Sequence, residues 1–560
     1  MARSNAGFNL SSVFGEVART IPDHPFLTWR GRRLTYADVD ARADGVAHYL
    51  TSAGPGCHTE RDGLQGHESG QDHLGIYLRN GNEYPEALIG SYRARVAPFN
   101  VNYRYVDEEL RYLLNDAKAR ALVYHAEFAP HVAALRDKLP DLDVLIQVAD
   151  DSGNQLVPGA VDYESITSTP CAAAGMPEPS PDDLYILYTG GTTGMPKGVL
   201  WRQHDIFVSA MGGRPFNGGA PFPSYEAVAE QAKNAAGVMS LLVIPPFMHG
   251  AAQWAAFHAM TIGGRLVLAD DPERLRPDAV LRLAEREKVT VISMIGDAVA
   301  RPLLDEIETG RYDLSATTVL TNGGATLSPA VQARLLAALP HATINDAVGS
   351  SESGYQMNTL ATTMWRSEAA TFNPQSDTAV IASDYSRVLK PGDGEGWLAR
   401  RDYIPLGYLN DADKTARTFP TVDGIRWSVP GDRARILVDG GRIELLGRDS
   451  VTVNSGGEKI FVEEVERAIA AHPDVYDVVV VGRPSPRWGN EVVAIVQPAE
   501  GRSPSDDELV DVCRQHVARY KVPKAFIRTA KVVRSPAGKA DYRWARDVAA
   551  NEPSREEQKA

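Results

Sequence analysis

The sequence predicts an α/β fold in two unequal parts: a large N-terminal domain of mainly parallel sheets covered by helices, and a small mobile α+β C-terminal domain. Three observations lead to this prediction. The chain has 560 residues, more than one domain usually holds. Short β-rich runs alternate with amphipathic helical segments between residues 184 and 350. Beyond about residue 434 this alternation gives way to a compact mixture of a hairpin, helices and strands.

The alternating region predicts βαβ units whose strands form a buried parallel sheet. The expected strands are LYILYTG (184–190), MSLLVIPPF (239–247), RLVLA (265–269), TVISMIG (290–296), TTVLTNGG (317–324) and ATINDAVG (342–349). The expected helices are a stretch after residue 190 and residues 251–264, 277–289, 297–310 and 328–340. Ligands bind at the carboxyl ends of such strands, so the glycine-rich segments there are candidate sites.

The C-terminal region predicts a separate small domain. ARILVDGGRIELLG (434–447) has the pattern of a hairpin with Asp439, Gly440 and Gly441 at its turn. After it we expect helices at 462–472 and 506–517 and strands at 475–482, 491–499 and 526–533. The predicted domains are therefore residues 1–448 and 449–545, with residues 546–560 as a disordered tail because the end of the chain is polar.

Composition limits the classes of function. The net charge is -14, from 58 basic and 72 acidic residues, which argues against nucleic acid as the main partner. No apolar run approaches eighteen residues, so no transmembrane segment is expected. The three cysteines are far apart and lack metal-ligand spacing, which favours free thiols and a cytoplasmic location. Several histidines lie within residues 54–73, but their spacing is poor for binding a metal ion, so we expect a solvated loop there and not a metal site.

The strongest chemical signal is YTGGTTGMPKGV, residues 188–199, directly after a predicted strand. Glycines let backbone N–H groups curl around phosphate oxygens, hydroxyls add hydrogen bonds, and Lys197 can neutralise charge. The segment is not a Walker A loop, which ends in Gly-Lys-Ser/Thr. The alternative, a glycine-rich surface turn, fits this composition after a strand less well.

YTGGTTGMPKGV resembles the phosphate-binding signature of the adenylate-forming superfamily, which comprises acyl-CoA synthetases, peptide-synthetase adenylation domains and beetle luciferases. The resemblance covers nearly the whole chain, because further signatures follow in order. These are PPFMHG (245–250), NGGATLS (322–328), DAVGSSE (346–352), WSVPGDRARI (427–436), GRDSVTVNSGGEKIFVEEVE (447–466) and SPAGKAD (535–541). It implies ATP, Mg²⁺ and coenzyme A as the groups bound.

The resemblance also implies where ATP lies. The phosphate loop supplies Thr189, Gly190, Gly191, Thr192, Thr193, Gly194 and Lys197, and the adenine side supplies Gly323, Gly324, Ala325, Asp346, Val348, Gly349, Ser350 and Ser351. Val348 stands where the family usually has an aromatic residue that stacks on adenine, and Ser351 keeps the hydroxyl of the usual threonine. Asp432 would accept hydrogen bonds from the ribose, although Pro430 replaces the usual threonine before it.

The remaining roles implied by the resemblance concern catalysis and movement. Glu352 would hold Mg²⁺, and Lys539, with Lys197, would stabilise the charge that develops during adenylation. Arg448 would contact ribose or phosphate, and Asp449 would be the hinge of the small domain. The loop at Gly456 and Gly457 would line the tunnel for the pantetheine of coenzyme A.

The expected substrate is a small-molecule carboxylic acid with a bulky hydrophobic body. FNVNYRY (99–105) and LWRQHDIF (200–207) most resemble acyl-CoA synthetases for fatty acids and steroid side chains, which favours a long-chain, steroid or terpenoid acid. The expected pocket residues are Phe247, Met248, His249, Gln253 and Trp254, with Gly323 at the border of the adenine site. Read alone, His249 would more often be an ordinary core or surface histidine.

Three alternatives stay open. The acyl group could pass to a carrier protein instead of coenzyme A, although no insertion that would block rotation follows residue 350. The chain could bind nucleotide without catalysis, against which Lys197, Glu352, Asp432 and Lys539 argue. A luciferase-like oxidation is the third. A homodimer is compatible with the sequence, which does not determine the oligomeric state.

Overall fold

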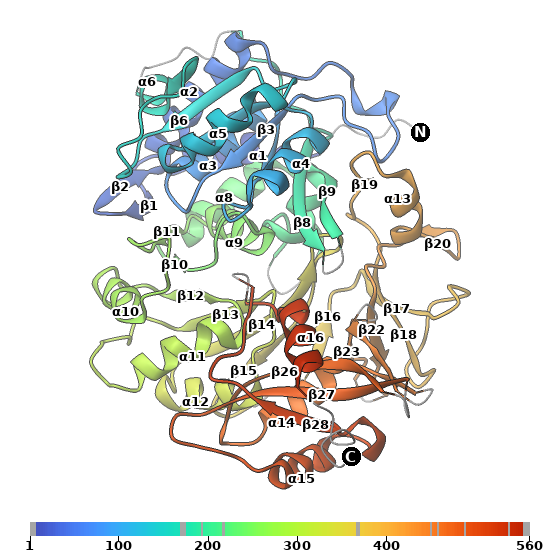
Figure 1. Ribbon diagram of the computed structural model, residues 1–560. Helices are drawn as coiled ribbons and strands as arrows, with labels where there is room; N and C mark the ends of the chain where they lie inside the picture. Colours follow the sequence, from blue (N-terminus) through green and yellow to red (C-terminus); the bar gives the residue numbers. More distant parts are fainter. Residues whose placement is uncertain are drawn as a thin grey trace.

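The structure is a computed structural model (Figure 1). It describes residues 7–168, 175–191, 194–215, 219–365, 370–438, 440–448, 451–455, 458–485, 489–535 and 538–552.

An eight-stranded sheet organises the first part of the N-terminal domain. Its order is β19 (Gly407–Tyr408), β9 (Gly194–Arg202), β8 (Leu184–Gly191), β4 (Ala97–Asn100), β3 (His73–Tyr77), β5 (Ala119–His125), β6 (Val144–Val148) and β7 (Ala160–Asp162). The strands from β8 to β7 pair in parallel, whereas β8 and β9 form an antiparallel hairpin. The helical stretch expected after residue 190 begins at α7 (Gln203–Ala210), because the chain first turns back as β9, a strand that the sequence analysis did not predict.

A thirteen-stranded sheet forms the second part. Its order is β17 (Thr378–Ala382), β18 (Glu395–Arg400), β22 (Asp432–Ile436), β23 (Ile443–Arg448), β16 (Thr371–Pro374), β15 (Gly354–Ala361), β14 (Thr343–Ser350), β13 (Val319–Gly323), β12 (Val291–Met294), β10 (Ser240–Val243), β11 (Arg265–Leu268), β1 (Pro25–Trp29) and β2 (Arg32–Thr35). From β14 to β1 the strands are parallel, as the alternating sequence predicts, and from β14 to β17 they are antiparallel.

Helices cover these sheets (Figure 1). They are α1 (Leu10–Thr20), α2 (Tyr36–Ala53), α3 (Glu83–Arg93), α4 (Asp107–Asp116), α5 (Ala129–Leu135), α6 (Tyr163–Thr167), α7 (Gln203–Ala210), α8 (Tyr225–Ala235), α9 (Gly250–Thr261), α10 (Pro277–Arg286), α11 (Gly296–Ile307), α12 (Pro329–Ala338) and α13 (Ala412–Thr418). Local signals set their limits: Thr35 and Asp38 form a capping box at the start of α2, and Gly54 ends it in the left-handed conformation at φ 105°.

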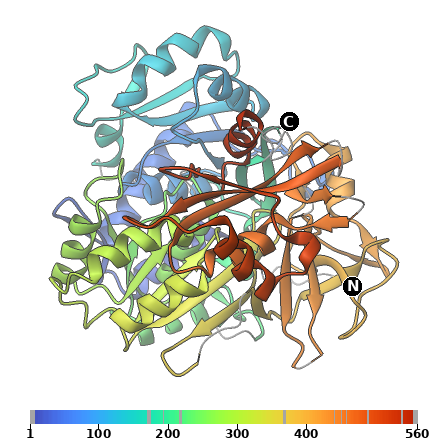
Figure 2. The ribbon, with the colours of Figure 1, turned by 60° about the horizontal axis from the view of Figure 1, so that its bottom comes forward.

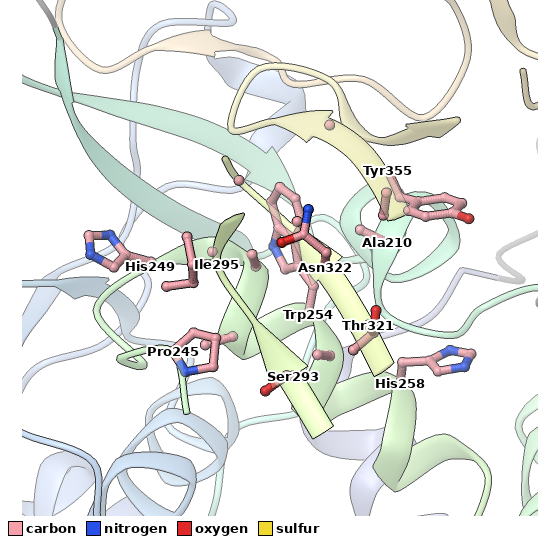
Figure 3. Close-up of a pocket in the computed structure, with 18 of the residues that line it drawn as sticks. Ala210, Pro245, His249, Trp254, His258, Ser293, Ile295, Thr321, Asn322 and Tyr355 are labelled. Carbon is pink, nitrogen blue, oxygen red and sulfur yellow. The ribbon is translucent and has the colours of Figure 1, made fainter. Parts of the chain in front are cut away.

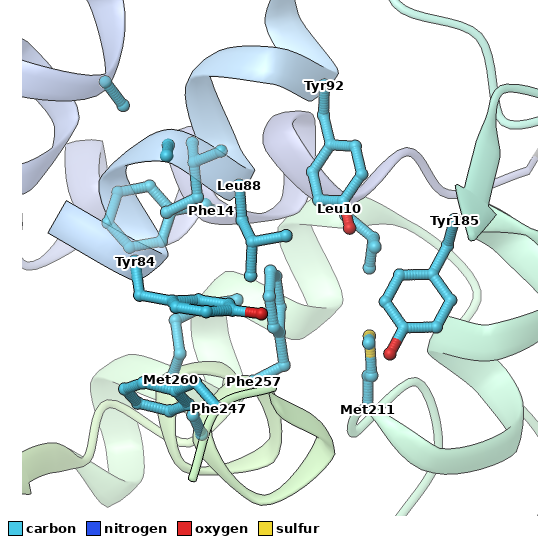
Figure 4. Packing of buried hydrophobic residues seen from close by; sticks show 14 of the residues in the cluster. Leu10, Phe14, Tyr84, Leu88, Tyr92, Tyr185, Met211, Phe247, Phe257 and Met260 are labelled. Atoms are coloured by element: carbon cyan, nitrogen blue, oxygen red, sulfur yellow. The ribbon is translucent and has the colours of Figure 1, made fainter. Parts of the chain in front are cut away.

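The largest core cluster joins α1, α3 and α9 beneath the sheets. Figure 4 shows aromatic and aliphatic side chains from these helices packed together, among them Phe14, Tyr84 and Phe257. Burial of this apolar surface is the main favourable term in the stability of the domain. The core therefore fixes α9, one wall of the site described below, against the rest of the domain.

The small C-terminal domain has its own sheet and its own core (Figure 2). The sheet contains β25 (Glu458–Ile460), β24 (Val453–Ser455), β27 (Gly489–Pro498), β26 (Val475–Ser485) and β28 (Ala525–Arg528), and the helices are α14 (Val462–Ala470), α15 (Asp506–His516) and α16 (Tyr542–Asn551). The prediction of a tail from residue 546 is wrong for residues 546–551, which belong to α16, because Ala545 and Ala549 are buried against the sheet.

The hairpin predicted at 434–447 is formed by β22 and β23, while Asp439 at its turn lies outside the described residues. Among the cysteines that the structure describes, Cys57 and Cys513 are free thiols. Within the described ranges no helix is both long enough and apolar enough to cross a bilayer.

The contact between α2 and α3 depends on a missing side chain at Gly90. A Cβ atom there would lie 2.6 Å from Val46 Cβ and 2.7 Å from the carbonyl oxygen of Ala43. An alanine normally stabilises a helix relative to glycine, but here the clash exceeds that gain. We predict that Gly90→Ala lowers the free energy of unfolding by about 1–3 kcal/mol in urea denaturation. Gly56→Ala is the matched control, since its added methyl would meet no atom within 4 Å; equal stabilities of the two variants would contradict the packing argument.

Candidate active site

A cavity of about 840 Å³ lies at the carboxyl ends of the parallel strands. Its walls come from the β8–β9 hairpin, α9, the ends of β12, β13 and β14, and the C-terminal loop that carries Lys539. Figure 3 shows side chains from these elements around the space, with Trp254 near its centre. The cavity thus lies where the fold class predicts a ligand.

The phosphate-binding segment forms the tip of the β8–β9 hairpin. Gly191 and Gly194 pair across the turn, and Thr189 pairs with Lys197 and lines the cavity. The side chain of Lys197 does not line the cavity; its ammonium group lies 3.4 Å from Asp411 Oδ2. Burial alone would lower the pKa of Lys197, but Tyr112, Asp116 and Asp411 together raise it by more than burial lowers it. The pKa therefore lies above its ordinary value, and the lysine stays charged. Thr192 and Thr193 lie outside the described residues.

The ends of β13 and β14 border the cavity on the adenine side. Of the predicted residues, those that line it are Gly323, Gly324, Val348, Gly349, Ser350 and Ser351. Gly324 adopts φ 82°, which L side chains rarely adopt. Ala325 and Asp346 do not line the cavity.

Asp346 instead belongs to a buried network beneath the nucleotide side of the cavity. Asn322 Nδ2 donates to Asp346 Oδ1 at 2.7 Å, and Gln332 Nε2 donates to Oδ2 at 3.4 Å. Asn322 Oδ1 accepts from the backbone N–H of Gly296 at 2.6 Å, so the network joins the ends of β13 and β14 to the start of α11. Burial raises the pKa of Asp346 to about 7. That its side chain contacts the nucleotide stays a prediction.

Glu352 does not line the cavity, and its side chain is held by a tyrosine. The hydroxyl of Tyr408 donates to Glu352 Oε1 at 2.8 Å, and Ser428 Oγ donates to the backbone carbonyl of Glu352. Lys414 lies over the ring of Tyr408 at 3.9 Å and acts electrostatically on Glu352 as well. The carboxylate therefore sits among cations with one of its oxygens oriented by Tyr408.

Asp432 and Arg448 lie opposite each other where β22 and β23 approach the small domain. Arg448 Nε donates to Asp432 Oδ1 at 2.9 Å, and the two residues are partners in the strand register. Asp432 is the largest influence on the pKa of Arg448 and raises it. The Arg448 backbone N–H donates to Glu463 Oε1 of α14 at 3.3 Å, which links the last strand of the large domain to the small one. Asp449, Gly456 and Gly457 lie outside the described residues.

The C-terminal loop brings Lys539 into the cavity. Gly538 packs so closely against the residue between β12 and α11 that a Cβ atom there would lie 2.9 Å from the carbonyl oxygen of Ile295. Lys539 lines the cavity beside Ser535. Desolvation by the surrounding walls and the charge of Arg448 lower the pKa of Lys539, against the opposing influence of Glu352 and Asp432. The lysine of the small domain therefore lies in the field of both carboxylates of the large domain.

The residues expected to contact the acyl group divide into two sets. Met248, His249 and Trp254 line the cavity, and burial, Lys539 and Arg104 together lower the pKa of His249 to about 4. Phe247 and Gln253 do not line it. Phe247 packs on Tyr84 with ring centroids 5.3 Å apart, and Gln253 Nε2 donates to the Phe247 carbonyl at 2.7 Å, so both lie in the core behind α9.

Histidines of the histidine-rich segment at residues 54–73 contact neighbouring polar groups of the protein. His58 Nε2 lies 2.6 Å from Asp72 Oδ2, and the His73 ring is buried against the Ala117 carbonyl. Within the described part of the chain, no group of three or more His, Cys, Asp or Glu residues has the arrangement of a metal site.

Comparison with known proteins agrees with this geometry. The model of the AMP-binding enzyme family matches residues 14–401, and that of the AMP-binding enzyme C-terminal domain matches residues 464–539. The chain belongs to the AMP-binding enzyme family. The resemblance seen in the sequence motifs is thereby confirmed.

Relatives in this family match over the full length. The "Medium-chain acyl-CoA ligase Mig" of Mycobacterium avium is 53% identical, covering 98% of this chain and 100% of the relative. The "Medium/long-chain-fatty-acid--CoA/3-oxocholest-4-en-26-oate--CoA ligase" of Mycolicibacterium smegmatis is 38% identical over 98% of both chains. The crystal structure of ATP-bound MatB from Rhodopseudomonas palustris has a TM-score of 0.78 at 21% identity, covers 97% of this chain and 99% of that one, and supports the fold.

Some site residues had no signal in the sequence. Tyr408 contacts Glu352, which lies more than fifty residues earlier in the chain. Asp411 contacts Lys197, which lies more than two hundred residues earlier. Arg214 lines the cavity from the turn after α7. Only the fold brings these residues to the site, because none belongs to a local pattern at the expected segments.

The buried carboxyl of Asp346 gives a prediction about pH. Its folded pKa of about 7 lies above the ordinary value of 3.8, so the folded state holds a proton that the unfolded state has lost. The Asp346 contribution therefore destabilises the fold progressively as pH rises from about 4 to 7. We predict that Asp346→Asn reduces the loss of unfolding free energy between pH 5.5 and 8.0 by up to about 2 kcal/mol.

Urea denaturation at both pH values measures this effect. Asp141→Asn, at an exposed position, is the control and should follow the wild type. If Asp346→Asn and wild type lost the same free energy between the two pH values, the protonated state of Asp346 would be excluded.

Proposed function

We propose that this protein is an ATP-dependent acyl-CoA ligase that adenylates a hydrophobic carboxylic acid and transfers the acyl group to coenzyme A. The observation that carries the proposal is the position of Lys539: it comes from the small domain, lines a large, mostly apolar cavity, and lies within the electrostatic influence of Glu352 and Asp432. A charged end and an apolar chamber suit a nucleotide phosphate joined to a hydrophobic acyl chain.

The chemistry follows from these positions. A carboxylate is a poor acyl donor, so its oxygen attacks the α-phosphorus of ATP, the bond to the bridging oxygen breaks, and pyrophosphate leaves. Lys539 would stabilise the negative charge that grows on the phosphate oxygens. Asp432 would accept hydrogen bonds from the ribose hydroxyls, and Thr189 would donate to phosphate. No side chain of the protein needs to act as the nucleophile.

Glu352 fits a Mg²⁺ ion of the kind that binds through one carboxylate and substrate phosphates. One of its oxygens is oriented by Tyr408, and the chemistry of a carboxylate at the charged end of the cavity suits a hard cation. When bound, the ion would neutralise phosphate charge.

Thioester formation requires a second arrangement. The thiol of coenzyme A attacks the acyl carbonyl, and AMP leaves. Lys539 fills the charged end of the cavity in the present arrangement, so we propose that the small domain rotates about Asp449 after adenylation and withdraws Lys539. The loop at Gly456 and Gly457 would then border the pantetheine.

The acid is proposed to be a medium- or long-chain fatty acid or a polycyclic acid of similar size. The relatives named above act on such acids according to their names. The cavity of about 840 Å³ supports this class, because it extends along α9 and the sheet to Leu241, Val291 and Val319 at the starts of β10, β12 and β13. A short acid would leave most of this apolar surface uncovered.

Pyrophosphate release tests the proposal. With ATP and Mg²⁺, wild-type protein should release pyrophosphate with fatty, steroid or terpenoid acids and form a thioester only when coenzyme A is added. Lys539→Ala should lose roughly 100-fold or more in pyrophosphate release, because a donor to the developing charge is lost. The variant should still convert a supplied acyl-adenylate into thioester.

Lys531→Ala is the control, an exposed lysine of the same domain outside the site. Full pyrophosphate release by Lys539→Ala would contradict the role of the lysine. Pyrophosphate release without thioester would indicate that the acyl group passes to an acceptor other than coenzyme A. If a folded protein that binds ATP released no pyrophosphate with any acid, the ligase function would be refuted.

A further inference from the structure

The end of the cavity opposite Lys539 contains charged and polar side chains. Figure 3 shows Tyr355, Ala210 and His258 on one side of Trp254, and His249 and Ile295, which lie near Lys539, on the other. Arg214, Gln375 and Arg400 line the cavity with Tyr355 and Ala210. An apolar acid would place its hydrocarbon end, which forms no hydrogen bonds, against this wall.

Two arginines share one carboxylate there. Arg400 Nη2 donates to Asp377 Oδ2 at 2.8 Å, and Arg214 Nη2 donates to the same oxygen at 3.1 Å. Arg400 is 1% exposed and Asp377 is 5% exposed. A further carboxylate, Asp402, also acts on Arg400, but it is 63% exposed and lies 3.7 Å from Arg401. The buried group therefore carries an excess of positive charge.

Among the described residues, several polar atoms in and beside the Arg400–Asp377 pair lack a hydrogen-bond partner. Arg400 Nε, Asp377 Oδ1 and Gln356 Nε2 are buried and have no hydrogen-bond partner. Leaving such a group unpaired is costly, and more so when the group is charged. These three atoms lie behind the cavity wall, because each is closed to solvent. Arg214 lines the cavity and its side chain is 13% exposed, so it is the charged member of the group that a ligand can reach.

A role in the fold explains only part of this arrangement. Arg400 Nη1 donates to Ser209 Oγ and to the carbonyls of Ser353 and Tyr355, and so ties β18 to β15 and α7. Arg214 adds little to that link, because the ion pair with Arg400 by itself already neutralises Asp377. Arg214 donates through Nε to the carbonyl of Val208 and through Nη2 to Asp377, while the residue also lines the cavity.

We propose that Arg214, with Arg400 behind it, forms a subsite for an oxygen acceptor at the far end of the acyl substrate. The preferred acid then carries an oxo group or a second carboxylate remote from the carboxyl group that reacts. This inference rests on the proposed ligase function and specifies its substrate class. The oxygen would receive hydrogen bonds from guanidinium donors in a water-poor setting, where a substrate that lacks it leaves those donors unpaired.

A series of straight-chain acids tests the subsite. Each chain length is compared in three forms: with a methyl end, with an oxo group next to the end, and with a terminal carboxyl group. We expect wild-type kcat/KM, measured by thioester formation, to favour an oxygen-bearing form over its methyl-ended partner by roughly 10- to 100-fold at the chain length that reaches Arg214. Preference for the dicarboxylic acid would indicate that net charge decides, and preference for the oxo acid that hydrogen bonding decides; both support the subsite.

Arg214→Met should abolish this ratio, and Arg274→Met, at an exposed position outside the cavity, should keep it. The wild-type series remains decisive even if Arg214→Met does not fold. Equal kcat/KM for all three forms at every chain length, or a ratio unchanged in Arg214→Met, would overturn the subsite while leaving the ligase function intact. Failure of wild-type protein to activate any acid would instead refute the proposed function.

Discussion

The charges at the junction of the two domains set the arrangement of the whole site. Arg448, the last residue of β23, donates to Asp432 from its side chain and to Glu463 of the small domain from its backbone. The same junction lets the loop at Gly538 pack on Ile295, which leaves Lys539 in the field of Glu352 and Asp432. Because the lysine comes from a domain with its own core, its position in the site depends on this small set of contacts between the two domains.

The remainder of the site is built on rigid elements. The parallel strands end at the nucleotide side, and α9 is fixed on its other face by the core around Phe257 and Met260. One chamber thus joins the charged end to an apolar length along the sheet. In the proposed mechanism the fold would separate two tasks: rigid walls would select the acid, and a movable lysine would serve the adenylation step.

Much of this arrangement could be predicted from the sequence. Periodic patterns identified the parallel strands and their helices, and the glycine-rich segments lie at the strand ends as expected. The β8–β9 hairpin was missed because a glycine-rich loop has the same composition whether a strand or a helix follows it. Gln253 lies in the core and not in the cavity wall, and α9 is apolar nearly all round, so its pattern does not show which face meets the core. Phe247 precedes this helix and packs on Tyr84, a contact between distant segments that no local pattern indicates. The partners of Glu352 and Lys197 were missed because they come from distant segments.

A crystal structure with a non-hydrolysable acyl-adenylate analogue, such as an acyl sulfamoyl adenosine, tests the central claim most directly. The account predicts the sulfamoyl group beside Lys539, the ribose on Asp432, and the acyl chain along α9 and the strands β12 to β14. An analogue bound with its nucleotide away from Lys539 and Asp432, or with its acyl chain outside this chamber, would contradict it.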